Sequence, residues 1–133
     1  MTPHSIHEIE DIDPPSAALL VARGITNIHE LLRRTTTPAQ RNALARKLGV
    51  TRERLADWIG RADLLRLTGA SAALVSMLEA CGVRSCAELQ HRVAANLYAR
   101  LKSFNDSRRL LDPMPSLEQI EAWIIEAANL VAG

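Results

Sequence analysis

Ten residues between Arg33 and Ser71 have the chemistry needed to bind an anion. Arginine donates two parallel hydrogen bonds to one carboxylate or phosphate, and lysine supplies a compact positive charge. A turn that contains glycine adds backbone N–H groups, which reach a phosphate only where no side chain is in the way. The candidate contacts for a nucleic acid or an acidic partner are Arg33, Arg34, Arg41, Arg46, Lys47, Arg52, Arg66, Thr68, Gly69 and Ser71.

Two turns at corresponding places in the sequence differ in this chemistry. The turn Asp11-Ile12-Asp13 carries two carboxylates, each of which repels a phosphate by about 1 kcal/mol in water and by more where water is excluded. The turn Gly69-Ala70-Ser71 keeps a glycine and a hydroxyl, and Arg66 and Thr68 come just before it. This second turn therefore remains a candidate for phosphate binding. The alternative is that Ser71 only caps a helix and Gly69 only relieves a tight turn.

Charge is distributed unevenly along the 133 residues, although the net charge is only +1. Residues 1–32 sum to −4, residues 33–66 to +6, residues 67–102 to +2 and residues 103–133 to −3. Separated blocks of opposite sign favour electrostatically steered association, either with another protein or with a second copy of the chain. Fourteen of the 16 basic residues are arginine, a bias that genome composition also explains without any partner.

The sequence lacks the motifs of common enzymes, so we expect no catalytic residue, no cofactor and no small-molecule substrate. Cys81 and Cys86 have no second cysteine pair, and His4 and His7 lie near the N-terminal end, so we expect no metal site. Buried, reduced thiols are the expected state of both cysteines. No segment is apolar enough to span a membrane, and the acidic start lacks the features of a signal peptide. A cytoplasmic location without a membrane partner follows as an expectation.

Helix start and stop signals predict an all-α fold with almost no strand. Trp58 and Trp123 each lie on an apolar stripe at helical spacing, which predicts that both side chains are in the core. The predicted helices begin at caps Asp13, Asn27, Thr37, Thr51, Ser71, Ser85 and Ser116, with a further helix over about Ala94 to Phe104. The helix after Ser85 is predicted to run to about Arg92, and the end of the chain near His4 and His7 is predicted to fray.

The sequence also contains an internal repeat. At an offset of 58 residues Gly24 matches Gly82 and Leu20 matches Leu78, and at an offset of 65 residues Trp58 matches Trp123. We therefore predict one domain over residues 1–133 made of two tandem repeats, residues 9–65 and 67–130. Because one repeat alone would leave its apolar stripes in water, the two are expected to pack around a shared core with pseudo-two-fold symmetry.

Four segments carry a resemblance to a known family: IEDIDPPSAALLVARGI, LRLTGASAALVSMLEACGV, NLYARL and MPSLEQIEAWI. From about Ile6 to Leu130 the chain resembles the bacterial family named domain of unknown function 4332. The resemblance implies tandem helix-hairpin-helix units, an element found in DNA repair proteins and in the C-terminal domain of RNA polymerase α subunits. In those units the turn usually reads Gly-apolar-Gly, so Asp11-Ile12-Asp13 departs from the pattern and we expect it not to bind DNA.

Taken together, these features predict a non-catalytic binding module. A protein partner or self-association is the preferred hypothesis, because the first turn has lost its phosphate-binding chemistry while the charge blocks remain separated. The alternative is sequence-independent binding of duplex DNA through Arg66 to Ser71 and the basic middle of the chain. Base stacking on single strands has little support, because only four aromatic residues are present.

Overall fold

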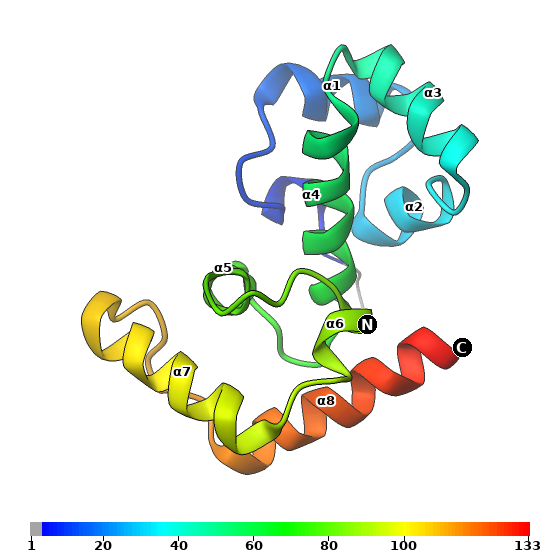
Figure 1. The fold of residues 1–133 in the computed structure, drawn as a ribbon. Coiled ribbons are helices and arrows are strands. Elements are labelled where there is room, and N and C mark those ends of the chain that lie inside the picture. Colours follow the sequence, from blue (N-terminus) through cyan, green and yellow to red (C-terminus); the bar gives the residue numbers. More distant parts are fainter. Residues whose placement is uncertain (1–3) are drawn as a thin grey trace. The chain divides into compact units, whose positions relative to one another are not determined.

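The computed structural model describes residues 4–133, and these residues are all helical apart from turns and one isolated bridge between Ser5 and Asn27 (Figure 1). The all-α prediction is confirmed. The elements are η1 (Ile6–Glu8), α1 (Pro14–Ala22), α2 (Ile28–Arg33), α3 (Pro38–Leu48), α4 (Arg52–Leu64), α5 (Ala72–Ala80), α6 (Cys86–Leu89), α7 (Ala94–Arg108) and α8 (Leu117–Ala132).

Capping side chains mark the starts of the α-helices at the predicted caps, whereas α7 begins after Val93 without one. Each predicted cap accepts a hydrogen bond from the backbone N–H three residues later, which satisfies one of the free donors of the first turn: Asp13, Asn27, Thr37, Thr51, Ser71, Ser85 and Ser116. At Thr37 the Gln40 side chain returns the bond and completes a capping box.

Three local predictions are corrected. Helix α6 ends at Leu89, well before Arg92, because the chain must turn before α7 begins at Ala94. Helix α7 continues four residues beyond the predicted Phe104, to Arg108. The residues before Ile9 do not fray where the structure describes them, since the Ile6 side chain is fully buried and its N–H donates to the Thr26 carbonyl at 3.2 Å.

The chain divides into two compact units, Met1–Arg66 and Leu67–Gly133. In the first unit α2 and α3 pack on α4, and α1 contacts α3; in the second unit α6 and α7 pack on α8, and α5 contacts α7. The order of helix contacts is thus the same in both units. Trp58 on α4 and Trp123 on α8 are 1% and 6% exposed, so the prediction that both tryptophans are core residues is confirmed. Cys81 and Cys86 are buried, as expected, and no disulfide joins them.

The connection that follows the first α-helix of each unit also has the same geometry. Gly24 and Gly82 adopt φ of +80° and +87°, which a side chain would strain. In the first unit the N–H that follows the glycine, from Ile25, donates to the Leu20 carbonyl at 2.9 Å; in the second unit the corresponding bond, to Leu78, measures 2.8 Å. Each helix therefore ends in a left-handed glycine cap that turns the chain into the next helix.

Candidate functional site

The first turn, Asp11-Ile12-Asp13, is occupied by charges of its own unit. Asp13 caps α1 by accepting from the Ser16 N–H at 3.0 Å, and its other carboxylate oxygen lies 3.1 Å from Arg54 Nη2. Arg61 donates to the Glu10 carbonyl at 2.7 Å. Both arginines belong to α4, so this helix lies against the acidic turn that precedes α1.

Ionisation of the Asp13 carboxyl is favoured by its hydrogen bonds. The Ser16 side chain and N–H, and more weakly the Arg54 charge, hold the pKa of the Asp13 carboxyl below its ordinary value. Asp11 adopts φ of +64°, and its side chain is 79% exposed with Arg61 at 3.9 Å. The turn thus presents two aspartate side chains, and that it does not bind DNA stays a prediction.

Just before the second turn, two hydrogen-bond donors are already used by a carboxylate of the same unit. The N–H and hydroxyl of Thr68 donate to the two oxygens of Glu126 on α8 at 2.9 and 2.8 Å. The Thr68 carbonyl accepts from Trp123 Nε1 at 2.8 Å, and the Ala70 N–H donates to the Leu67 carbonyl at 3.0 Å. Glu126 therefore engages both donors of the residue that directly precedes the turn.

The remaining residues of that turn have structural roles. The Ser71 hydroxyl caps α5 by accepting from the Leu74 N–H at 3.2 Å. Gly69 adopts φ of +77°, a conformation that glycine reaches without strain. These are the two roles that the alternative interpretation of the turn assigned to Ser71 and Gly69. Arg66 is paired with Asp63 at the end of α4, so its charge is also used within its own unit.

Two further residues that were predicted to contact a partner form hydrogen bonds to neighbouring groups of the chain. Arg33 donates to Glu30 at 2.7 Å, and this hydrogen bond lowers the pKa of Glu30. The Arg41 Nε donates to the Thr35 carbonyl at 2.8 Å. Glu30 therefore compensates the Arg33 charge, and the Arg41 guanidinium is directed to a backbone carbonyl.

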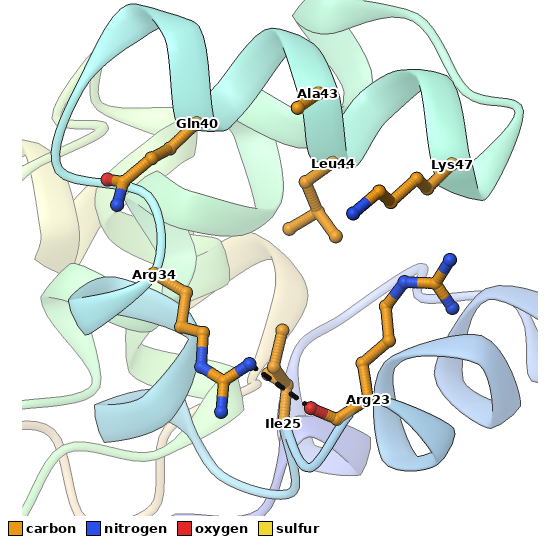
Figure 2. Close-up of a pocket in the computed structure, with 7 residues that line it drawn as sticks. All are labelled: Arg23, Ile25, Arg34, Gln40, Ala43, Leu44 and Lys47. Carbon is orange, nitrogen blue, oxygen red and sulfur yellow. Dashed lines mark hydrogen bonds between the residues drawn. The ribbon is translucent and has the colours of Figure 1, made fainter.

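The other candidates gather around α3 and the start of α4. Arg46 and Arg52 are exposed on these two helices. Arg34 and Lys47 instead line a pocket of about 330 Å³ between α3 and the α1–α2 connection. The pocket residues are Arg23, Ile25, Arg34, Gln40, Ala43, Leu44 and Lys47, and they include three cations but no acid. Figure 2 shows Lys47 and Arg23 on facing sides of the pocket, with Leu44 beside Lys47 and Ile25 between Arg34 and Arg23.

Arg34 has a structural role in addition to its place in the pocket. Its Nη1 donates to the Arg23 carbonyl at 3.2 Å, at the C-terminal end of α1 (Figure 2). At the corresponding place in the second unit, Arg92 donates to the Cys81 carbonyl at the end of α5. A guanidinium in this position satisfies a carbonyl that the helix itself leaves free.

A comparison with models of protein families identifies the family of this chain. The family model "Domain of unknown function (DUF4332)" matches residues 10–130. The chain belongs to the DUF4332 family. No curated protein and no solved structure matches it.

One pocket residue of this DUF4332 protein, Arg23, was not predicted from the sequence. It lies in the acidic block of residues 1–32, where a charge count gives it no weight. The structure turns it toward α3 because Gly24 ends α1 directly after it. The internal repeat could have singled out Arg23. At the 58-residue offset Arg34 matches Arg92, whereas Arg23 matches the buried Cys81. The exposed cation is thus particular to the first unit.

Within residues 4–133 no group of three or more histidine, cysteine, aspartate or glutamate side chains is arranged to hold a metal ion. Across the same residues, none of the helices is both long and apolar enough to cross a membrane.

Proposed function

We propose that this DUF4332 chain is a non-catalytic binding module for an acidic protein partner, and that it recognises this partner through the pocket between α3 and the α1–α2 connection. The observation that carries the proposal is the state of two pocket cations. Among the residues that the structure describes, the side chains of Arg23 and Lys47 have no hydrogen bond or ion pair, and both residues are exposed. Their charges are therefore available to an acidic group from outside.

The architecture we propose for the module is two tandem copies of one helix-hairpin-helix-like repeat, residues 9–65 and 67–130. The shared order of helix contacts supports this, as do the caps Asp13 and Ser71 and the paired arginines Arg34 and Arg92. Packing of the two copies about a pseudo-two-fold axis around a shared core stays a prediction. So does a bacterial, cytoplasmic setting, which the family resemblance and the sequence led us to expect.

A protein partner is preferred to DNA because the two turns use their binding chemistry internally. Glu126 occupies the Thr68 donors, and Asp11 and Asp13 make the first turn acidic. Useful affinity for duplex DNA comes from several simultaneous phosphate contacts. Arg66 and Arg41, two of the arginines that would supply them, are held by internal partners.

Sequence-independent binding of duplex DNA is the second candidate function. It is favoured by the exposed cations Arg46, Lys47 and Arg52, which follow one another closely at the end of α3 and the start of α4. Such a surface would hold DNA by charge alone, with a steep dependence on salt.

Fluorescence anisotropy separates the two functions. A labelled polyglutamate peptide and a labelled DNA duplex are each titrated with the protein at low and at moderate salt. We expect the peptide to bind at low salt and Lys47→Ala to weaken this binding more than Arg46→Ala does, because only Lys47 lines the pocket. Absence of peptide binding at low salt would contradict the proposal. Tight DNA binding that weakens steeply with salt and with Arg66→Glu would establish the second function instead.

A further inference from the structure

We infer that the pocket formed by Arg23, Arg34 and Lys47 takes a phosphate monoester, in the form of a phosphorylated side chain on the partner protein. This inference rests on the proposed function and adds the chemical group that the partner inserts. The pocket lies within the first unit, so it needs no contribution from residues beyond Arg66.

Charge balance favours a phosphate monoester over a carboxylate. Three cations line the pocket and no acid does, although the Arg34 Nε lies 3.9 Å from Glu30 just outside it. A carboxylate brings one negative charge and two acceptor oxygens. A phosphorylated side chain brings about −1.5 to −2 charges and three acceptor oxygens. The doubly charged group therefore compensates more of the positive charge and satisfies more of the available donors.

The walls of the pocket also suit a small anion at the end of a side chain. Ile25 and Leu44 are 2% and 7% exposed and form an apolar surface between the cations. The exposed cations therefore stand around a small apolar floor. A volume of about 330 Å³ lies at the lower end of the range for ligand pockets, so it fits one charged group and its short stem.

Arg34 is ordered before any ligand arrives. The bond from its Nη1 to the Arg23 carbonyl holds the guanidinium beside the pocket, which reduces the entropy that an anion must remove on binding. The same bond compensates the carbonyl end of α1, which would otherwise repel an anion. Arg23 and Lys47 face each other from two different elements (Figure 2), so they can close on the anion from both sides.

The second unit supplies a comparison inside the same chain. Arg92 repeats the bond that Arg34 makes, but the buried Cys81 stands where the first unit has Arg23. A guanidinium that caps a helix is therefore present in both units, whereas the added exposed cation is present only in the first. The arginine at the Arg34 position thus has a structural role in both units. Arg23, which the second unit lacks, is assigned a binding role together with Lys47.

The test is an NMR titration of the ¹⁵N-labelled full chain with small probes. The probes are N-acetyl-phosphoserine methylamide, N-acetyl-glutamate methylamide and inorganic phosphate, and a DNA duplex with and without a 5′-phosphate distinguishes a nucleic-acid source. The variants are Arg23→Ala and Lys47→Ala, with Arg46→Ala as the matched control because Arg46 shares the last turn of α3 with Lys47 but does not line the pocket. Arg34 is left unchanged, since it caps α1.

We expect the phosphoserine probe to shift the amides of Ile25, Leu44 and Lys47 and to bind about fivefold or more tightly than the glutamate probe. Arg23→Ala and Lys47→Ala should each weaken binding about threefold or more, whereas Arg46→Ala should not change it. Inorganic phosphate should shift the same amides.

Three results would overturn the inference: equal binding of the glutamate probe, shifts that ignore both pocket variants, or tighter binding of the 5′-phosphorylated duplex. Equal binding of the two amino-acid probes at these amides would leave the proposed acidic-partner function intact. Failure of the polyglutamate peptide to bind would instead contradict that function, so the two claims fail separately.

Discussion

Replacing Glu126 by alanine tests the claim that the second turn is already filled by the chain itself. The substitution removes two hydrogen bonds to Thr68, at 2.9 and 2.8 Å. A hydrogen bond to a charged group contributes about 1.5–3 kcal/mol when well shielded, and an exposed one contributes less. Because both bonds are exposed, we expect the pair together to contribute about 1–2 kcal/mol to the free energy of unfolding.

Glu121→Ala is the matched control. Glu121 is exposed on the same helix and has no hydrogen bond or ion pair among the described residues, while the gain in helix propensity from glutamate to alanine is the same at both positions. The difference between the two variants therefore isolates the Thr68 contact. Both are made in a Trp58→Phe background, so that the fluorescence of Trp123 follows urea unfolding of the second unit.

The expected result is that Glu126→Ala unfolds at a lower urea concentration than Glu121→Ala, by the equivalent of about 1–2 kcal/mol. Equal midpoints would refute the reasoning. The Thr68 donors would then be free in solution, and the second turn would again be available to a phosphate.

Further predictions concern the turns and the two cores. Trp58→Ala and Trp123→Ala should each lower the free energy of unfolding by about 3–5 kcal/mol in urea titrations, because both side chains are buried; a nearly neutral variant would contradict core packing. Gly69→Ala should cost about 1–2 kcal/mol through its positive φ alone, since a Cβ there meets nothing within 4 Å; an unchanged urea midpoint would refute this. The lowered pKa of Asp13 means that its contribution is complete above the ordinary aspartate value of about 4 and is lost as pH falls through the lower folded pKa. Asp13→Asn, which keeps the cap, should therefore reduce the acid sensitivity of thermal unfolding, and an unaltered pH profile would oppose this.

Helix starts could be predicted from the sequence because their causes are local. A capping side chain and the amide that it accepts from are three residues apart, so Thr37 and Ser116 identify their helices without knowledge of the fold. The end of α6 at Leu89 was missed because no glycine or proline marks it, and the turn there depends on where α7 must pack. The N-terminal segment was predicted to fray for a similar reason: the contact between Ile6 and Thr26 joins residues that are distant in the sequence.

The candidate site was only partly predictable. Arg34 and Lys47 were chosen for their charge, but charge does not distinguish a pocket cation from one such as Arg33, which is held by Glu30. The contact between Thr68 and Glu126 spans 58 residues, and no sequence pattern at the turn indicates it. The left-handed conformation of Asp11, where the second turn has Gly69, likewise follows from the shared hairpin geometry rather than from the preference of aspartate.

The most direct test of the central claim is a comparison of where two ligands bind. The amide spectrum of the ¹⁵N-labelled chain is recorded with the polyglutamate peptide and, separately, with a DNA duplex at low salt. We expect the peptide to shift amides of the α1–α2 connection and of α3 around Ile25 and Leu44, and neither ligand to shift those of Thr68 to Ser71. DNA-induced shifts centred on Thr68, Gly69 and Ser71, without a peptide effect at the pocket, would contradict the central claim.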